Sequence, residues 1–187
     1  MIFKKFICGP LQNNAYVFGD NGEVALIDTP KGSGVILDYL EKSNLDLKYI
    51  IFTHTHFDHI PDLNIFTKAF PDAKVLVHKD EIEKIDNAIL LNGKEKFEVG
   101  GIPFQIIHTP GHTAGGICIL AEDKLFSGDT LFFDTIGRTD LPGGSYSNLV
   151  NAIKEKLLIL PDETAVEPGH GEETTIGYEK ETNQYLI

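Results

Sequence analysis

Three of the seven histidines in this chain fall within one hexapeptide, His54-Thr55-His56-Phe57-Asp58-His59. Imidazole and carboxylate groups at such close spacing suit a borderline divalent metal ion. Zinc is the first expectation, with iron and manganese as alternatives. Four potential ligands in six residues cannot all surround one small ion, so two adjacent metal ions would divide them more naturally. Chance clustering in a polar loop is a poor account of this pattern.

Three further donors, His112, Asp129 and His170, each follow a glycine, and each lies just after a segment with the pattern of a β-strand. A glycine at that point permits a positive φ or a close backbone approach, which turns the next side chain sharply off the strand end. Singly, each motif is typical of a surface turn. Together with the hexapeptide, they predict one convergent site at strand ends, where α/β folds commonly place ligand-binding groups.

Such a site needs a scaffold that brings distant strand ends together. Apolar runs predict strands, and amphipathic segments with capping signals predict helices. We expect strands at 2–8, 14–18, 23–28, 49–53, 74–77, 95–99, 103–109, 116–121, 124–127 and 164–167. We expect helices at 33–43, 61–69, 80–87, 147–158 and 175–185. Strands in runs with helices between them favour a layered α/β protein with mixed sheets.

Composition limits the partners. The 187 residues fit the usual range of about 100–200 residues for one domain, so we expect a single domain over 1–187. The net charge of −12 disfavours nucleic acid and anionic membrane surfaces as partners. No apolar run has the roughly 20 residues of a membrane span, and no signal peptide is evident. With Cys8 and Cys118 interpreted as buried reduced thiols, we expect a cytoplasmic protein, and the oligomeric state stays unknown.

The order of these motifs resembles the metallo-β-lactamase superfamily over nearly the whole chain. The resemblance implies an α/β fold of four layers, the αββα sandwich, in which two mixed sheets pack face to face with helices outside. It also implies two metal ions. The first would be held by His54, His56 and His112. The second would be held by Asp58, His59 and His170, with Asp129 bridging the two ions.

Within that superfamily, the chain is most similar to the glyoxalase II-like (hydroxyacylglutathione hydrolase-type) thioester hydrolases. The similar segments are 12–16, 128–132, 136–144 and 169–183. The resemblance implies a small-molecule thioester as substrate. Segment 137–140, Gly-Arg-Thr-Asp, is also shared with persulfide dioxygenases, which use one iron ion. A mononuclear-iron persulfide dioxygenase is therefore the alternative, and a non-catalytic metal-binding module is a third possibility.

The ligand set permits hydrolysis without a serine or cysteine nucleophile. Two ions about 3.5–4 Å apart can hold a bridging hydroxide at neutral pH, because metal binding lowers the pKa of water. This hydroxide would attack the thioester carbonyl while one ion stabilises the oxyanion. Asp58 would orient the hydroxide and carry its proton. The thiolate leaves without a strong general acid.

Other activities of the superfamily are disfavoured. Antibiotic hydrolysis would require secretion, flavodiiron-type enzymes usually carry Glu where this chain has His56, and RNA processing conflicts with the net charge. Full-length glyoxalase II has a C-terminal helical domain with cationic glutathione contacts, whereas this chain ends 17 residues after His170. We therefore expect small acyl-thioesters to be hydrolysed comparably with glutathione conjugates.

Arg138 and Tyr146 are the candidate substrate-binding residues. Arg138 could bind a substrate carboxylate. Its alternative role is a structural ion pair with Asp134 or Asp140. Tyr146 could line the pocket or could simply pack at the start of a helix.

Three other side chains have open assignments. Asp28 ends a predicted buried strand and is either a partner of a ligand histidine or a turn former. His108 is expected to be a core histidine or a partner of a ligand, and His78 to be a surface histidine.

Overall fold

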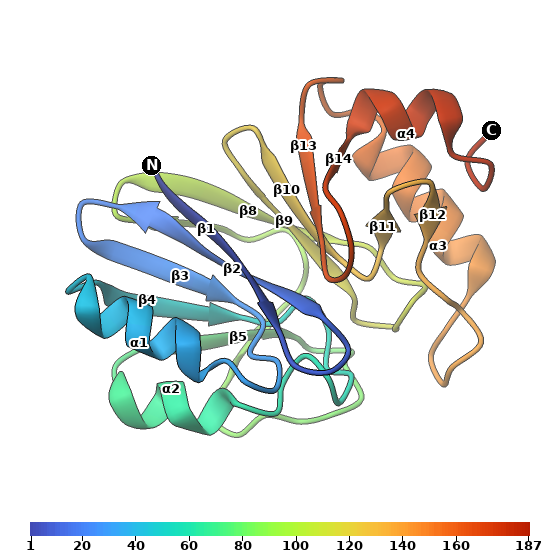
Figure 1. Cartoon of the computed structure of the whole chain (residues 1–187). Helices are drawn as coiled ribbons and strands as arrows, with labels where there is room; N and C mark the ends of the chain where they lie inside the picture. The colour runs from blue at the N-terminus through green and yellow to red at the C-terminus, as the bar shows by residue number, and fades with distance from the viewer.

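Two six-stranded mixed sheets form the scaffold in the computed structural model, which describes all residues from 1 to 187 (Figure 1). The first sheet contains six strands in sequence order. The first three strands pair antiparallel, and the third to the sixth pair parallel, so the third strand belongs to both parts. The strands are β1 (Ile2–Cys8), β2 (Asn13–Asp20), β3 (Glu23–Ile27), β4 (Asp46–Ile51), β5 (Lys74–His78) and β6 (Ile89–Leu91).

The second sheet has the order β14-β13-β10-β9-β8-β7, and its one parallel pair is β10 with β13. Its strands are β7 (Lys96–Val99), β8 (Ile102–His108), β9 (Ile117–Ala121), β10 (Lys124–Gly128), β13 (Ala165–Pro168) and β14 (Thr174–Thr175). A short separate hairpin joins β11 (Leu131–Phe132) to β12 (Thr135–Ile136).

Helices cover the outer face of each sheet (Figure 1). Helices α1 (Gly34–Lys42) and α2 (Leu63–Ala69) pack on the first sheet through an apolar cluster that includes Ile36, Leu40 and Phe66. Helix α3 (Tyr146–Ala152), which continues as the π-helical turn η1 (Ile153–Leu157), and helix α4 (Ile176–Thr182) pack on the second sheet. This arrangement confirms the αββα sandwich that the resemblance implied, and the layered α/β architecture with mixed sheets that the sequence pattern predicted.

An aromatic core joins the two sheets. Phe126 of β10 lies 5.2 Å from both Phe18 and Tyr16 of β2, measured between ring centroids. Strand β2 is almost entirely buried because its alternate residues face this core and the α1–α2 layer. Both cysteines are buried and unpaired.

The sheets are also hydrogen-bonded to each other at one end. The amide of Ile117 donates to the carbonyl of Thr53 (2.9 Å), and the amide of Asn14 donates to the carbonyl of Gly169 (2.7 Å). The Tyr16 hydroxyl donates to the carbonyl of Pro168 (2.7 Å). The loop after β4 is therefore held against β9, and the loop after β13 is held against β2, so polar residues at this end of the two sheets can converge.

The predicted helix at 80–87 is wrong. This segment is a series of turns, because the Glu81 side chain is buried and accepts hydrogen bonds from the loop after β4. Strand β6 pairs with β5 and was not predicted. His78 on β5 is buried, so the expectation of a surface histidine was wrong. None of the helices combines the length and the apolar character needed to cross a membrane.

Truncating the central aromatic of the core tests how the sheets are held together. We expect Phe126→Ala to lower the free energy of unfolding by about 3–5 kcal/mol, because it opens a cavity between the sheets. Phe57→Ala is the matched control, since Phe57 is 77% exposed, and it should cost at most about 0.5 kcal/mol. Urea denaturation at equal metal load measures both, and equal losses would contradict this view of the core.

Candidate metal centre

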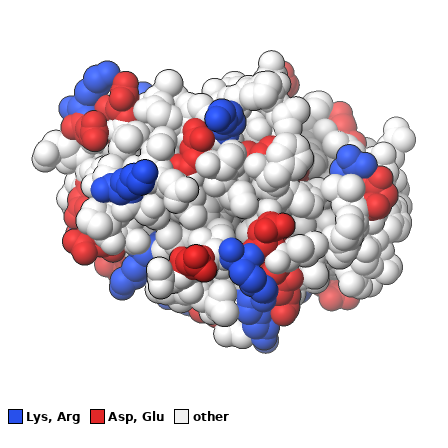
Figure 2. Space-filling view, turned by 90° about the horizontal axis from the view of Figure 1, so that it is seen from below, with Lys and Arg blue, Asp and Glu red and all other residues white.

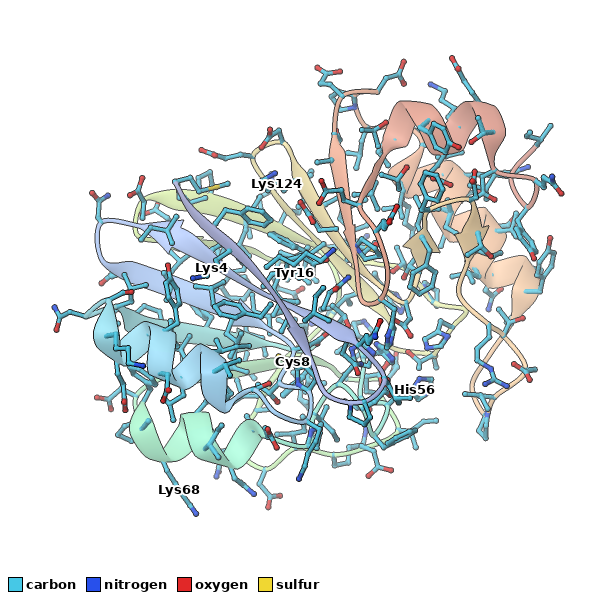
Figure 3. All side chains as sticks on the ribbon, viewed as in Figure 1. Lys4, Cys8, Tyr16, His56, Lys68 and Lys124 are labelled. Atoms are coloured by element: carbon cyan, nitrogen blue, oxygen red, sulfur yellow. The ribbon has the colours of Figure 1, made fainter.

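Seven side chains from four loops meet at one end of the sandwich. They are His54, His56, Asp58, His59, His112, Asp129 and His170, and they follow β4, β8, β10 and β13. In the stick view His56 lies between the ends of the two sheets (Figure 3). The structure thus brings the seven donors predicted from the sequence together.

His54, His56 and His112 form the first group. Their ring centroids are 4.6–4.8 Å apart, and each pair of rings is nearly perpendicular, with interplanar angles of 82–87°. Three perpendicular imidazoles can direct a nitrogen each at a common point. His56 Nδ1 lies 2.9 Å from His112 Nε2. Two nitrogens bound to one tetrahedral zinc ion would lie about 3.4 Å apart, so the spacing is close to that of a ligand pair.

Asp58, His59 and His170 form the second group. Asp58 Oδ2 lies 3.7 Å from His59 Nε2 and 3.4 Å from His170 Nε2. The Asn13 side-chain amide donates to Asp58 Oδ2 (2.9 Å) and lies 3.3 Å from His170 Nε2. Asn13 therefore fixes Asp58 beside His170, a role that the sequence analysis did not assign.

Asp129 lies between the two groups. One carboxylate oxygen, Oδ1, is 3.6 Å from His59 Nε2, and the other, Oδ2, is 3.6 Å from His112 Nε2. A carboxylate whose oxygens face one member of each group has the position needed to join two ions. Glycine is required beside it, because a Cβ at Gly169 would collide with Asp129 Oδ1.

Hydrogen bonds on the far side of each ring fix the tautomer of four histidines. The Nδ1 atoms of His59, His112 and His170 face oxygen acceptors, namely Asp28 Oδ2 (2.8 Å), the Arg138 carbonyl (2.8 Å) and the Leu11 carbonyl (3.1 Å). His54 Nδ1 lies 3.1 Å from Thr53 Oγ1. Because Nδ1 of each ring is engaged in this way, Nε2 is the nitrogen left to bind a metal ion.

Asp28 orients one histidine of each group from the side that faces away from the cluster. It accepts hydrogen bonds from the Thr53 amide (2.9 Å) and hydroxyl (2.8 Å) and from His59 Nδ1. Because the Thr53 hydroxyl gives its proton to Asp28, its oxygen is free to accept from His54 Nδ1. Of the two roles that the sequence left open for Asp28, the structure shows the partner of a cluster histidine.

Three buried polar atoms of the cluster have no hydrogen-bond partner: His54 Nε2, His59 Nε2 and Asp129 Oδ1. Leaving a buried polar atom unsatisfied costs about 1–3 kcal/mol, so such atoms are rare. All three point into the cluster, where divalent cations would satisfy them together. The residues therefore fit a pair of metal ions.

The charges of the cluster lead to the same conclusion. Burial and the neighbouring imidazole of His59 hold the pKa of His54 well below its usual value, so this ring is neutral. Burial opposes the charge on His59 too, but Asp129 and Asp28 more than compensate and raise its pKa to about 9. The carboxylates thus favour a positive charge at His59, and a metal cation at Nε2 would supply it.

The Asp58 carboxyl is ionised at neutral pH. Burial opposes its ionisation, but the hydrogen bond with His170 and the charge of His59 hold the pKa of this carboxyl well below its usual value. The same pairing, helped by Asp129, raises the pKa of His170 although burial acts against it. Asp58 is therefore a carboxylate at neutral pH, able to accept but not donate a hydrogen bond.

Glu81 fastens the two loops that carry the first group. Its buried carboxylate accepts from the Thr55 amide (2.8 Å), the Thr55 hydroxyl (2.7 Å) and the Thr113 hydroxyl. Thr55 lies between His54 and His56, and Thr113 follows His112. Nothing in the local sequence distinguishes Glu81 from the other charged residues of segment 79–84, so its role was not predicted.

The two candidate substrate-binding residues lie apart from the cluster carboxylates. Arg138 forms a two-pronged ion pair with Asp140, at 2.8 Å for each bond, and both side chains are exposed. This is one of the ion pairs that the sequence analysis weighed. Tyr146 begins α3 and is exposed. Substrate binding by either residue stays a prediction.

His78 and His108 do not belong to the cluster. Their rings stack 4.0 Å apart with an interplanar angle of 15°, and Asp80 lies beside them. Parallel rings direct their nitrogens along parallel lines, so they do not converge on one ion. His108 Nε2 hydrogen-bonds to the Ala114 carbonyl (2.9 Å), which supports the loop after His112.

Comparison with known sequences places these observations in context. The family model described as the metallo-beta-lactamase superfamily matches residues 8–170. The chain is 32% identical to the hydroxyacylglutathione hydrolase GloC of Haemophilus influenzae, over 94% of this chain and 92% of that protein. It is 33% identical to the probable metallo-hydrolase YqgX of Bacillus subtilis, over 100% of this chain and 98% of that protein.

Three solved structures superpose closely on this chain. The BLEG-1 B3 metallo-beta-lactamase superposes with a TM-score of 0.91, at 33% identity and full coverage of both chains. ETHE1 from Myxococcus xanthus gives 0.88, at 30% identity, over 98% of this chain and 84% of that one. The protein TTHA1623, solved in a di-iron-bound form, gives 0.87, at 32% identity, over 98% of this chain and 100% of that one.

Removing single donors should separate the two halves of the cluster. We expect Asp129→Ala to lose metal from both positions, because its carboxylate faces a histidine of each group. His170→Ala should lose chiefly the second ion, leaving about one ion per chain. Metal content after dialysis, measured by plasma mass spectrometry, distinguishes these outcomes. Two ions retained by Asp129→Ala would exclude a bridging role for this carboxylate.

Metal binding should release protons. With a pKa of about 9, His59 is protonated at pH 7.5, and a metal ion at Nε2 must displace that proton. We expect release of about one proton from His59, plus a contribution from His170, and an affinity that rises with pH until about pH 9. Calorimetric titrations in two buffers with different ionisation enthalpies measure the release. Identical enthalpies in both buffers would contradict the assignment.

Proposed function

The chain belongs to the metallo-β-lactamase superfamily, and from this premise we propose that it is a metal-dependent hydrolase of small thioesters. The observation that carries the proposal is the pair of ligand groups sharing Asp129, with three buried atoms that divalent cations would satisfy. A relative that covers almost the whole chain is named a hydroxyacylglutathione hydrolase, which supports thioester chemistry.

Two divalent ions would be held by the first and second groups, with Asp129 between them, and would supply an activated water and a polarised carbonyl. The chain's own residues provide the rest. Asp58 is ionised and held by Asn13, so it can accept a hydrogen bond from the attacking water and orient it. Asp28 and the Leu11 carbonyl keep the rings of His59 and His170 from rotating.

Zinc is the proposed metal, because imidazole and carboxylate donors in a site this buried match its preferences. Iron has support from the structural relative solved in a di-iron-bound form. Imidazole suits iron as well, so iron is the alternative metal. The second candidate function, a mononuclear-iron dioxygenase, would leave Asp58 and His59 without a metal to bind.

The surroundings of the cluster offer little to hold a large anion. The guanidinium of Arg138 is engaged by Asp140. Figure 2 shows Lys and Arg side chains scattered among acidic ones on the face seen from below, with no continuous basic patch. This supports a substrate recognised chiefly through its thioester rather than through a charged thiol carrier.

A comparison of two thioesters tests this proposal. We expect kcat/KM for lactoylglutathione to exceed that for a simple lactoyl thioester without the peptide by well under a thousandfold, because no group of free cations awaits the peptide carboxylates. Both rates should fall to background when the metal is removed by chelation and should return on reloading. A β-lactam in the same panel is the control that shows whether the hydrolysis is specific to thioesters.

Two results would contradict the proposal. A preference of a thousandfold or more for lactoylglutathione would mean that the chain builds a peptide pocket. One iron per chain, with oxygen consumed in the presence of a persulfide and no thioester hydrolysed, would establish the dioxygenase instead.

A further inference from the structure

An apolar groove of about 610 Å³ lies directly beside the first ligand group. Its walls come from four segments: the loop after β4, the turn at 81–83, the loop after β8 and the loop at 141–142. The apolar side chains lining it are Phe57, Ile60, Pro61, Ile82, Leu141 and Pro142. Phe57 and Ile82 are 77% and 53% exposed, unusually high for large apolar residues beside a catalytic cluster.

The groove is continuous with the cluster. His56 itself lines it, together with Thr55 and Thr113, which flank the ligands of the first group. A substrate whose carbonyl lies at the cluster would therefore extend one of its arms along the groove. The Glu81 carboxylate at its base is fully engaged by the two threonines, so it does not demand a polar partner from the substrate.

The charge of the groove excludes an anionic arm. No Lys or Arg lines it, and its exposed charged residue is Glu83. The nearby ammonium of Lys84 turns away and donates to the backbone carbonyls of Lys79 and Glu81. A carboxylate entering the groove would meet a negative side chain and no compensating donor, whereas an uncharged chain would bury apolar surface.

We infer that the groove binds an uncharged, apolar chain attached to one side of the scissile carbonyl. This inference rests on the proposed thioester hydrolase function. A second hollow of about 430 Å³ flanks His170 on the other side of the cluster and is lined by Phe132, Phe133 and Ile136. The cluster thus lies between two hollows, and the chain in the groove belongs either to the acyl group or to the thiol.

Two substrate series distinguish the acyl group from the thiol. One series carries acetyl, butanoyl and hexanoyl groups on mercaptoethanol, and the other carries acetyl groups on ethanethiol, butanethiol and hexanethiol. An open groove that half-buries each methylene should raise kcat/KM by about twofold per methylene, or about 15-fold over four. We expect this rise in one series, and a loss of tenfold or more when a carboxylate ends the hexanoyl or hexyl chain of that series.

Variants locate the effect. Ile82→Ser combined with Leu141→Ser should reduce the ratio of longest to shortest substrate to less than about threefold, because both side chains line the groove. Ile159→Ser is the matched control, since Ile159 is 74% exposed and does not line the groove, and it should keep the full ratio. A ratio near one in both series for the unaltered protein, or a full ratio in the double variant, would overturn the inference.

A binding measurement keeps this inference separate from the proposed function. In a metal-loaded sample with labelled isoleucine methyl groups, 2-octanone is a non-hydrolysable analogue with a hexyl chain, and 2-butanone is its short control. We expect 2-octanone alone to shift the Ile82 methyl signal. If that shift occurs while no thioester is hydrolysed, the proposed function fails and the groove stands. If thioesters are hydrolysed without the shift and without chain-length dependence, only the groove proposal fails.

Discussion

The hydrogen bonds of the Asp28 carboxylate are the interaction on which the rest of the site depends. One oxygen holds the Thr53 amide, and the other holds the Thr53 hydroxyl and the His59 ring. Thr53 in turn holds His54, so one buried carboxylate orients a histidine of each ligand group. Asp28 has a positive φ of 59°, a conformation that Asp tolerates better than most residues and that lets the chain turn directly after β3.

A cluster of this kind, taken by itself, lowers the stability of the fold. Its orphaned nitrogens and carboxylate oxygen would each cost about 1–3 kcal/mol, and burial together with the neighbouring imidazoles lowers the pKa of His54 and of His56. The surrounding scaffold compensates by being rigid. The aromatic core between the sheets and the main-chain bonds between Asn14 and Gly169 hold the strand ends in place. Rigidity at these ends is what preorganises donors from four separate loops.

The sequence predicted those features of the structure that depend on residues close together along the chain. Buried strands such as β3 and β4 produce unbroken apolar runs, and glycines before His112 and Asp129 mark sharp turns, so the scaffold and the donors could both be predicted. Long-range partners leave no such trace. Asn13 and Glu81 act on residues 45 and 26 positions away, and the pattern of segment 80–87 is that of a polar helix. Its conformation is decided instead by the burial of Glu81 against Thr55, a tertiary contact that overrides local propensity.

The separation of the metal donors from the residues that line the groove explains how one scaffold supports several chemistries. The donors lie at strand ends, where movement is restricted, and the fold that positions them is shared with solved proteins that carry different names. The proposed substrate contacts lie instead at Ile82 and Leu141, whose apolar side chains take no part in the hydrogen bonds that hold the donors. Glu81 is the link between the two, because its carboxylate supports the ligand loops while its neighbour Ile82 faces the groove. Selectivity can accordingly be altered at Ile82 or Leu141 while the donor geometry, fixed by Asp28, Asn13 and Glu81, stays as it is.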